Sequence, residues 1–378
     1  MKNVLVTGAD GFIGRNLIAS LRILGDLEIL RFEAQNTSEE LQAMVNAADF
    51  VFHLAGVNRP QELDEFDRGN RGLTEQLVDC LRASDRKTPV LLSSSIQADL
   101  DNPYGRSKRS AEEAVLRYNE DTGAEVFIYR LTNVFGKWCR PNYNSVVATF
   151  CHNIANGLPI TISDPDATIN LVYIDDVVSE FVRQMRGGFE PALPSPRSSV
   201  PEHWVVRPGY PVKLGIIASL LYSFQAGRES LSVPDLADEF AKKLYSTYLS
   251  YLPEDGFSYP LKMNTDARGS FTEFIKTPDR GQVSVNIAKA GITKGNHWHH
   301  TKSEKFLVVS GKGVIRFRRI DSPKVLEYFV SGNKLEVVDI PPGYTHNIEN
   351  LGDTDMVTIM WANEPFDPDK PDTMFAGV

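Results

Sequence analysis

The first half of the chain alternates short apolar runs with amphipathic segments. Five runs of four to six residues predict strands: Val4–Thr7, Glu28–Arg31, Phe50–Leu54, Val90–Ser93 and Val126–Leu131. Apolar residues at helical spacing between these runs predict helices over Gly14–Leu24, Leu73–Ala83 and Lys108–Asn119. Because apolar strands that alternate with helices are typical of a sheet covered on both faces, we expect an α/β, doubly wound parallel sheet.

This pattern changes after about Gly187. Six prolines between residues 187 and 211 predict a mobile surface loop, and Leu214–Phe240 predicts a helix interrupted at Pro234. From Lys262 onward, short β-rich runs alternate with Gly and Asp turns, which favours a small antiparallel barrel or jelly roll. We therefore expect two domains, residues 1–245 and 246–378.

Composition narrows the class of protein. The 378 residues are 42% hydrophobic, which is enough for two packed cores. A net charge of −9 argues against a nucleic-acid partner, whose binding surface would be basic. Three widely spaced cysteines favour a reducing compartment, and no apolar stretch approaches the ~20 residues of a membrane span. Residues 1–7 predict a strand rather than a cleaved signal, so we expect a cytoplasmic protein.

A glycine-rich turn follows the first predicted strand and opens the first predicted helix. Glycine there permits a tight turn and lets backbone N–H groups approach a pyrophosphate, as in a Rossmann-type dinucleotide site. A tight turn in a domain that binds nothing is the alternative. The candidate cofactor-binding residues of this turn are Gly8, Gly11, Phe12, Ile13, Gly14 and Arg15.

A second candidate group combines a tyrosine, a lysine and a serine run. Tyr104 and Lys108 lie four residues apart, so both side chains share one face of the predicted helix. A nearby ammonium is expected to lower the pKa of the phenol and make it a proton donor at neutral pH. Ser93–Ser95 ends a predicted strand, where a hydroxyl could hold a carbonyl oxygen. A solvated helix face is the alternative for a lone Tyr–Lys pair.

These motifs, in this order, resemble the extended short-chain dehydrogenase/reductase family over roughly residues 1–240. Further family landmarks are H-L-A-G at residues 53–56, R-L-T-N-V-F-G and Y-I-D-D-V. The resemblance implies that Tyr104 is the acid/base, Lys108 its activator and ribose ligand, and Ser95 the carbonyl donor, with Ser94 as an alternative. Only eight residues separate Ser95 from Tyr104, fewer than in most relatives. The cofactor-lining strand end would contribute Leu54, Ala55 and Gly56.

The second strand indicates the cofactor type. Enzymes that use NAD place Asp or Glu at its end, whereas arginine suits the 2′-phosphate of NADP. Arg31 ends this strand and Arg15 follows the third glycine, which favours NADPH. Glu33 lies close by and would suit NAD, and either arginine could simply be solvated.

Three histidines and a glutamate in the second half have the spacing of metal ligands. His297 and His299 alternate on a predicted strand, Glu304 follows, and His346 comes after a Pro-Gly turn. The segments G-x5-H-x-H-x4-E-x6-G and P-x-G-x2-H-x3-N resemble the two motifs of the cupin family, an all-β barrel with an internal metal. We expect one divalent ion, Zn²⁺ above others. His300 would face away from the metal, or support a ligand or the substrate. A metal-free cupin is the alternative.

The stretch before this motif resembles the substrate-binding strands of deoxysugar 3,5-epimerases, which are cupin-like. The resemblance implies that nucleotide or sugar contacts come from Arg268, Phe271, Glu273 and Gln282, with Lys294 in place of the epimerases' arginine. The epimerases' base histidine would fall on His297. Since a metal ligand is a poor free base, we assign His297 to the metal and leave the base open.

The whole chain resembles bifunctional enzymes of capsule and O-antigen synthesis. The resemblance implies C3 epimerisation in the cupin domain, then NADPH-dependent C4 reduction, of UDP-2-acetamido-2,6-dideoxy-β-L-arabino-hexos-4-ulose. The product would be UDP-2-acetamido-2,6-dideoxy-β-L-talose, a precursor of L-fucosamine, and the enzyme a homodimer. The sugar nucleotide would contact Arg130, Asn133, Lys137, Arg140, Asn142 and Asn144. Packing of that loop is the alternative for these residues.

Two other functions fit parts of the sequence. One is an NAD-dependent sugar-nucleotide 4-epimerase with a structural cupin, which would consume no reduced cofactor. The other is a redox-sensing protein that binds NADPH without catalysis. The Tyr104–Lys108 pair argues against the second, because a sensor of this fold needs neither residue.

Overall fold

The computed structural model describes residues 2–58, 62, 64–187, 203–261, 264–266, 269–271, 275, 281–364 and 369–378. The chain forms two compact units, each made of two segments. Unit 1 comprises residues 1–145 and 169–211, and unit 2 comprises residues 146–168 and 212–378. The backbone is therefore not divided once near residue 245. The assignment of separate activities to residues 1–245 and 246–378 stays a prediction.

Unit 1 is built on a five-stranded parallel sheet in the order β2-β1-β3-β4-β5. Both neighbours of β1, β2 and β3, follow it in sequence and lie on opposite sides of it. Connections that diverge in this way are where parallel sheets bind ligands, at the carboxyl ends of the strands. The predicted parallel sheet and its five strands are confirmed. Their bounds are β1 Lys2–Thr7, β2 Leu27–Phe32, β3 Phe50–His53, β4 Val90–Ser95 and β5 Val126–Leu131.

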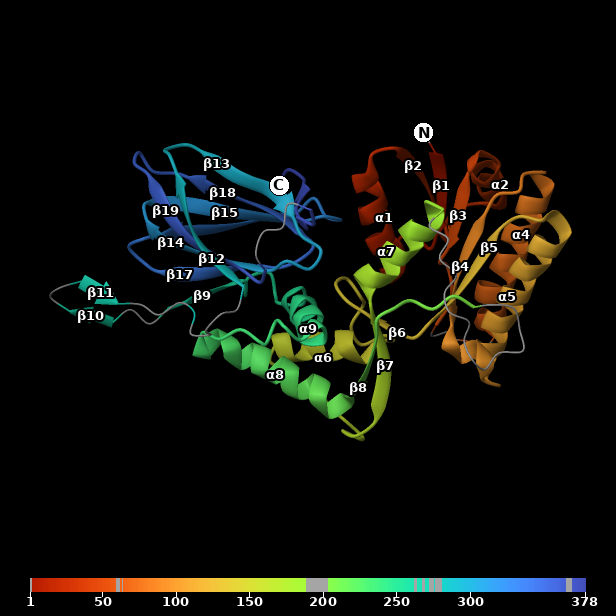
Figure 1. Cartoon of the computed structure of the whole chain (residues 1–378), viewed down its shortest axis with the longest axis horizontal. Helices are drawn as coiled ribbons and strands as arrows, with labels where there is room; N and C mark the ends of the chain where they lie inside the picture. Colours follow the sequence, from red (N-terminus) through yellow and green to blue (C-terminus); the bar gives the residue numbers. More distant parts are fainter. Residues whose placement is uncertain are drawn as a thin grey trace. The chain divides into compact units, whose positions relative to one another are not determined.

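Helices cover both faces of this sheet, as Figure 1 shows. Successive residues of β3 face opposite sides of the sheet. Val51 belongs to the core that α2, α4 and α5 cover. Phe52 stacks on Phe181 of α7, with ring centres 6.2 Å apart. One layer holds α1 (Phe12–Leu24) and α7 (Ile174–Met185), and the other α2 (Ser38–Ala47), α4 (Leu73–Ala83) and α5 (Pro103–Thr122). Between β3 and α4 lie α3 (Asp64–Phe66) and the π-helical turn η1 (Asp67–Gly72).

Helix α5 begins five residues earlier than the pattern predicted. Asn102 caps it by accepting the backbone N–H of Gly105 at 2.7 Å, and Pro103 occupies the first turn. The short stretch between Ser95 and this cap is taken up by the 3-10 helix η2, Ile96–Asp99. A compact turn thus replaces a longer loop, and it brings Ser95 and the start of α5 together.

Unit 2 contains two five-stranded antiparallel sheets. One has the order β12-β19-β14-β17-β9, the other β16-β15-β18-β13-β20. Their strands are β9 Ser258–Pro260, β12 Gln282–Ala288, β13 Thr293–Trp298, β14 Glu304–Ser310, β15 Lys312–Arg319, β16 Val325–Ser331, β17 Glu336–Ile340, β18 Tyr344–Asn350, β19 Met356–Ala362 and β20 Met374–Phe375. The predicted antiparallel β region is confirmed, and its assignment as a cupin barrel stays a prediction. A short hairpin, β10 (Asn264–Asp266) and β11 (Gly269–Phe271), precedes β12.

Three helices complete unit 2: α6 (Val146–Ala155), α8 (Leu214–Ser230) and α9 (Glu239–Leu249). The predicted helix over Leu214–Phe240 is two helices. Helix α8 ends where Leu231 adopts a left-handed conformation, and Asp238 caps the start of α9. No helix in the described ranges is long and apolar enough to cross a membrane.

A buried charge cluster joins α8 to the outer face of the first sheet. Nζ of Lys305 lies 2.6 Å from a carboxylate oxygen of Asp339 and 2.9 Å from the hydroxyl of Tyr259. The Arg228 guanidinium of α8 stacks 4.5 Å from the Tyr259 ring centre. Lys305 and Asp339 are almost fully buried, so each charge depends on the other for compensation.

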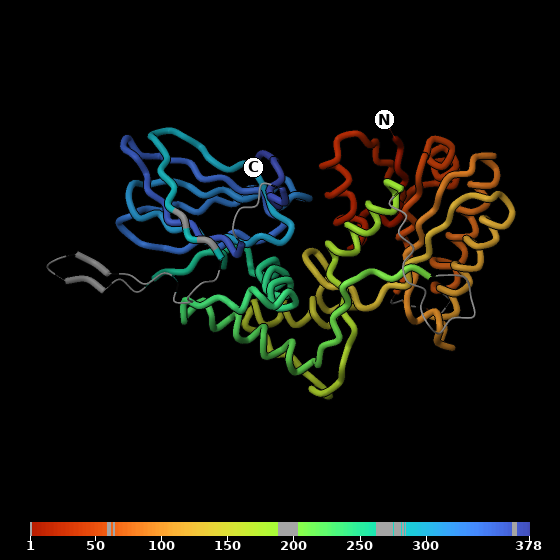
Figure 2. The backbone as a smooth tube through the Cα atoms, in the orientation of Figure 1, coloured from red at the N-terminus to blue at the C-terminus, as the bar shows by residue number. Residues whose placement is uncertain are grey.

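The chain passes between the two units three times, after residues 145, 168 and 211. Strands β6 (Asn133–Phe135), β7 (Thr168–Tyr173) and β8 (Gly209–Lys213) form a separate three-stranded sheet. Figure 2 follows the backbone of unit 1 from its red-orange first segment to its yellow-green second segment, after the chain has contributed α6 to unit 2.

Two candidate active sites

The glycine turn of unit 1 forms a backbone cradle at the start of α1. Gly8 has φ of 66°, and a Cβ there would lie 2.7 Å from the backbone of Ala55. A Cβ at Gly14 would lie 2.2 Å from the carbonyl oxygen of Gly8. Within the described residues no side chain caps the first turn of α1, whose N-cap is Gly11. The first N–H groups of the helix are thus free to bind a pyrophosphate, which fits a dinucleotide.

The two arginines expected near the cofactor have partners in the protein. Arg15 donates from Nη2 to the carbonyl oxygen of Trp138 at 2.6 Å, and Arg31 forms an exposed ion pair with Asp10. Glu33 directly follows β2 and accepts the backbone N–H of Asp10. Arg31, which favours NADPH, and Glu33, which favours NAD, therefore both contact Asp10 in the glycine turn. The NADPH preference stays a prediction.

A hydrogen-bond chain that the sequence analysis missed fixes the cofactor-lining strand end. The Ala55 N–H donates to Oγ1 of Thr7 at 3.2 Å, and Thr7 Oγ1 lies 2.7 Å from Nδ1 of His53. Nε2 of His53 lies 2.8 Å from Oγ1 of Thr74, which donates to the carbonyl oxygen of Asn70 at 2.6 Å. Since the Thr74 proton is used on Asn70, His53 carries its hydrogen on Nε2 and accepts from Thr7.

The His53 imidazole is suited to this neutral tautomer. Burial and the charge of Lys108 lower the pKa of His53 to about 3. The sequence signal for this chain is H-L-A-G, a family landmark that does not by itself indicate the hydrogen bonds of His53. The buried threonines carried no signal, because a lone Thr in a strand or helix is common.

Asn70 extends this hydrogen-bond chain to α5. Its side chain accepts the N–H of Val57 and donates to the Val57 carbonyl oxygen and to Oγ of Ser107, at 2.9, 3.1 and 2.9 Å. Ser107 precedes Lys108 on α5. Residues 55–57 are thus held at both ends, with Gly56 so close to Nζ of Lys108 that a Cβ would lie 3.1 Å from it.

The structure brings Ser95, Tyr104 and Lys108 together at the carboxyl end of β4. Ser95 lies close enough to Tyr104 to lower the pKa of its phenol. Nζ of Lys108 lies 6.0 Å from the Tyr104 ring centre and donates to the carbonyl oxygen of Ser93 at 3.2 Å. The hydroxyl of Ser94 is buried and donates to Glu112. Of the two serines considered, Ser95 is therefore the one beside Tyr104.

The expected electrostatics of this pair are corrected by the structure. Burial raises the pKa of Tyr104, and the nearby Ser95 hydroxyl only partly opposes this. Burial lowers the pKa of Lys108 to about 8, against the charge of Glu112. Desolvation therefore outweighs the expected effect of the ammonium on the phenol. A phenol that stays protonated at neutral pH suits a proton donor.

Two of the predicted substrate-binding residues are engaged in buried ion pairs. Arg130 binds both carboxylate oxygens of Glu112, at 2.9 and 2.6 Å, and pairs with Asp99. Lys137 is buried and lies 2.6 Å from Asp175. Both cations are thus placed to hold the site's framework, and direct contact with a sugar nucleotide stays a prediction.

The other predicted substrate residues of unit 1 are exposed. Asn133 donates to the carbonyl oxygen of Asn170 at 3.2 Å, and the Arg140 guanidinium lies 5.3 Å from the Tyr143 ring centre. Asn142 has a left-handed backbone with φ of 54°. Asn133, Arg140, Asn142 and Asn144 are therefore accessible to a ligand, and their role stays a prediction.

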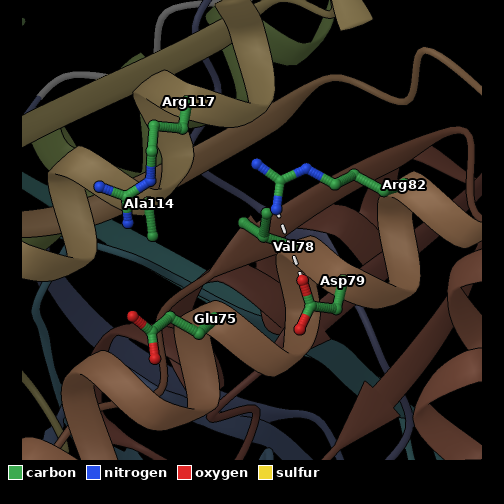
Figure 3. A pocket seen from close by; sticks show the side chains of 6 residues that line it. All are labelled: Glu75, Val78, Asp79, Arg82, Ala114 and Arg117. Atoms are coloured by element: carbon green, nitrogen blue, oxygen red, sulfur yellow. Dashed lines mark hydrogen bonds and ion pairs between the residues drawn. The ribbon is translucent and has the colours of Figure 1, made fainter. Parts of the chain in front are cut away.

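A shallow hollow between α4 and α5 lies apart from these residues (Figure 3). Arg82 and Asp79 pair across part of it at 3.4 Å. It contains none of the predicted site residues, and its charges face solvent, where ion pairs contribute little. We assign it no chemistry. Its lining consists of Glu75, Val78, Asp79, Arg82, Ala114 and Arg117.

In unit 2 the four predicted metal ligands converge. One ligand atom from each of His297, His299, Glu304 and His346 lies within 4.8 Å of the others. Nε2 of His299 and Nε2 of His346 each lie 3.3 Å from the same Glu304 oxygen. His346 is fully buried, and in the described part of the chain neither of its ring nitrogens has a hydrogen-bond partner. Unsatisfied buried imidazole with a carboxylate fits a divalent first-row metal such as zinc.

The pKa shifts of His297 and Glu304 favour the forms of these side chains that bind a metal. Burial, with the neighbouring His346 and His299, lowers the pKa of His297 to about 4. Burial alone would raise the pKa of Glu304, but the imidazoles of His299 and His346, each 3.3 Å away, hold it below its usual range. A neutral imidazole and an ionised carboxylate are the forms that bind metals.

A β-bulge in β13 sets the ligand geometry. The register with β18 shifts between Gly295 and His297, and Asn296 between them has φ of 58°. The shift places His297 opposite His346. Bulges re-aim side chains at functional sites. His300 lies on the other side, with its ring centre 4.5 Å from that of Trp298.

The epimerase-type substrate residues are only partly described. Arg268 and Glu273 lie outside the described residues, as do the side chains of Phe271 and Gln282. Nζ of Lys294 donates to Oδ1 of Asn286 and to the carbonyl oxygen of Ile287, at 2.9 and 2.7 Å. All five assignments stay predictions.

The parallel sheet, the glycine cradle and the Ser95–Tyr104–Lys108 group together define an oxidoreductase that uses a nicotinamide cofactor. Comparison with known proteins agrees. Residues 4–191 match the NAD dependent epimerase/dehydratase family, and residues 264–374 match the polysaccharide biosynthesis C-terminal domain.

Full-length relatives give the particular family. The chain is 48% identical over 375 residues to the UDP-2-acetamido-2,6-beta-L-arabino-hexul-4-ose reductase of Pseudomonas aeruginosa strain PA103, covering 99% of this chain and 98% of that protein. The chain therefore belongs to the family of this reductase. It is also similar to the capsular polysaccharide assembling protein CapF from Staphylococcus aureus, with 55% identity, a TM-score of 0.67 and full coverage of both chains. A UDP-glucuronic acid 4-epimerase from Bacillus cereus, 18% identical, shares the fold over 59% of this chain and 83% of its own, with a TM-score of 0.50.

Proposed function

We propose that this chain is a bifunctional enzyme that epimerises C3 and then reduces C4 of UDP-2-acetamido-2,6-dideoxy-β-L-arabino-hexos-4-ulose. The product would be UDP-2-acetamido-2,6-dideoxy-β-L-talose, for surface polysaccharide synthesis. The observation that carries the proposal is the presence, in one chain, of a Ser95–Tyr104 pair suited to a ketone and a separate four-ligand metal cluster. The full-length similarity to a reductase of a UDP-linked 4-keto sugar supports the C4 step.

In the reduction, the residues of unit 1 act on the C4 oxygen. Ser95 and Tyr104 present two adjacent hydroxyls, so the ketone oxygen would accept from both, and Tyr104 would give its proton as the alkoxide forms. Nζ of Lys108 donates to the carbonyl oxygen of Ser93 and lies beside Gly56. From there it would orient the site and bind the ribose of the cofactor. A bound NADPH supplies the hydride. Arg31 and Arg15 beside the glycine turn support NADPH over NADH.

In the epimerisation, the unit 2 cluster stabilises charge on the substrate. His297, His299, Glu304 and His346 would hold one divalent ion, which we expect to be Zn²⁺. Such an ion would act as a Lewis acid toward the C4 ketone oxygen. It would stabilise the negative charge that develops there when the C3 proton is removed. Because His297 is a ligand in this arrangement, another residue would remove the C3 proton.

The proposal includes a homodimer in the cytoplasm. Support for a second copy comes from β12, an edge strand whose residues Val283, Val285 and Ile287 are 60%, 64% and 54% exposed. An apolar row on an exposed edge strand favours pairing with another chain.

The test is to incubate the 4-keto sugar nucleotide with enzyme in heavy water, without NADPH, and to follow C3 by NMR. Deuterium at C3 that requires His299 and the metal would support epimerisation in unit 2. A C3 position that keeps its proton while added NADPH is still oxidised would leave only a C4 reductase with a structural metal site.

A second candidate is an NAD-dependent 4-epimerase. Glu33 favours it, because it follows β2 at the position where NAD enzymes bind the ribose 2′-hydroxyl. This candidate predicts interconversion of C4 epimers with no net oxidation of added NADPH, which absorbance at the nicotinamide band measures directly.

A further inference from the structure

One segment distant in sequence lies against the metal cluster of unit 2. Strand β20 pairs with β13, so that Phe375 lies opposite His297 and Met374 opposite Trp298. The Ala376 N–H donates to the carbonyl oxygen of Asn296 at 2.9 Å, and its own carbonyl oxygen accepts the hydroxyl of Thr345. Residues 371–377 therefore contact both strands that carry the histidine ligands.

Within this segment, Asp372 makes the contacts closest to a ligand. Its backbone carbonyl oxygen lies 2.5 Å from Nδ1 of His299. Its carboxylate accepts the backbone N–H groups of His300, Thr301 and Lys302, at 2.9, 2.9 and 2.7 Å. Asp372 thus contacts His299 through its backbone, and the three residues that follow His299 through its side chain.

The contact determines which nitrogen of His299 can bind a metal. A carbonyl oxygen only accepts hydrogen bonds, so Nδ1 of His299 carries the hydrogen and the lone pair stays on Nε2. Nε2 is the atom that faces Glu304, 3.3 Å away. The backbone of Asp372 has φ of 36°, a conformation that side chains other than Asn and Asp rarely adopt and that persists where surrounding contacts hold it.

We propose that Asp372 is a positioning residue for the metal centre: its carboxylate anchors the 300–302 turn so that its carbonyl oxygen fixes the tautomer and orientation of His299. The inference rests on the metal role proposed above for the four ligands. Partners that orient metal-bound histidines typically account for 10- to 100-fold in metal affinity. We therefore expect loss of the carboxylate to weaken zinc binding by about 10-fold, without removing a ligand.

The test measures zinc affinity of the full chain by competition with a chromogenic chelator. Asp372→Ala removes the carboxylate, and Asp372→Asn keeps one acceptor oxygen and tolerates the same backbone conformation. Asp353→Ala is the matched control, since Asp353 is exposed. We expect the zinc dissociation constant to rise about 10-fold for Asp372→Ala, less for Asp372→Asn, and not for the control. Thermal unfolding of the metal-free proteins measures separately what the lost hydrogen bonds to the 300–302 turn cost the fold.

A readout of geometry separates positioning from general stability. In the zinc-loaded wild type, ¹⁵N NMR of the imidazoles should show His299 protonated at Nδ1, and this signature should weaken in Asp372→Ala. Unchanged zinc affinity in both variants would overturn the proposal. Equal destabilisation of the metal-free and zinc-loaded variants, with the Nδ1 signature intact, would also overturn it in favour of a structural role. Failure of the wild type to bind any divalent metal would instead refute the proposed metal function, and the inference with it.

Discussion

The two candidate sites are assembled in opposite ways. In unit 1, Tyr104, Lys108 and Glu112 are spaced four residues apart on one helix, and Ser95 ends the adjacent strand. In unit 2, the four candidate ligands come from β13, from His299 directly after it, and from β14 and β18, and Asp372, 73 positions away, contacts His299. The first site depends on a local helix and strand ends, whereas the second depends on long-range pairing. We therefore expect single substitutions at the unit 1 site to reduce activity, and those among the long-range contacts of unit 2 to reduce stability or metal binding.

The largest expected effect is the loss of C4 reduction on Tyr104→Phe. The substitution keeps the ring but removes the proton donor, and general acids contribute about 10²- to 10⁴-fold in rate. We expect kcat for NADPH oxidation to fall by about that factor, with NADPH binding retained. Stopped-flow absorbance and a fluorescence titration measure the two quantities.

A matched control sharpens this test. Tyr222→Phe changes an exposed tyrosine of α8 and should leave both quantities unchanged. C3 deuteration should also continue in Tyr104→Phe if the two sites act separately. Loss of deuteration together with reduction would mean that one site performs both steps.

A second test addresses the buried pair of unit 2. Asp339→Asn leaves Lys305 and Arg228 without their shared carboxylate, and breaking a buried pair typically costs about 3–5 kcal/mol. Lys305→Met should cost less, because Arg228 still lies 3.6 Å from Asp339. Urea unfolding, followed on the transition of unit 2, measures the free energy of unfolding.

Lys334→Met is the control for the difference between Asp339→Asn and Lys305→Met. It removes an exposed ion pair with Glu336. Surface pairs contribute up to about 1 kcal/mol, so its effect should be small. Equal losses for Asp339→Asn and Lys305→Met would contradict a role for Arg228.

The smallest expected effect is a pH-dependent gain in stability on Lys108→Met. Below pH 8 the lysine is charged in both states, and a pKa lowered on folding from 10.5 to about 8 costs the fold about 3 kcal/mol. Between pH 8 and 10.5 the unfolded chain binds more protons, so the stability of the wild type rises with pH. The variant lacks this penalty at every pH.

The difference in unfolding free energy between variant and wild type should therefore be largest near pH 7 and shrink toward pH 10. Urea titrations of both proteins at these two values measure it. The variant also loses the hydrogen bond to Ser93, which offsets part of the gain at both values. A difference that stays constant from pH 7 to 10 would rule out burial of a charged Lys108.

The sequence predicted most of the fold because its signals were local. Strands such as Val126–Leu131 matched to the residue, since an apolar run in a doubly wound sheet has turns at both ends. The start of α5 was missed because Asn102 and Pro103 are cap signals with no apolar periodicity. Segment 146–168 packs with unit 2 through long-range contacts, which no local pattern encodes.

The candidate sites divide in the same way. Motif spacing was enough to group Tyr104 with Lys108, and His297 with His299. It could not show that burial outweighs the charge of Lys108 at Tyr104, because desolvation depends on packing. Nor could it show that Arg130 is engaged by Glu112, or that Asp372 contacts His299, since those partners lie 18 and 73 positions apart.

The chain passes between the units after residues 145, 168 and 211. During synthesis, unit 1 lacks its second segment until residue 211 has emerged, and α6 waits for its partners α8 and α9, which follow residue 211. A gene cut after residue 145 would leave unit 1 without its second segment, and a cut after residue 211 would leave unit 2 without α6. A cut after residue 168 would leave both units incomplete. No single cut therefore yields two complete units, and the two proposed activities are tied to one polypeptide by the path of its chain.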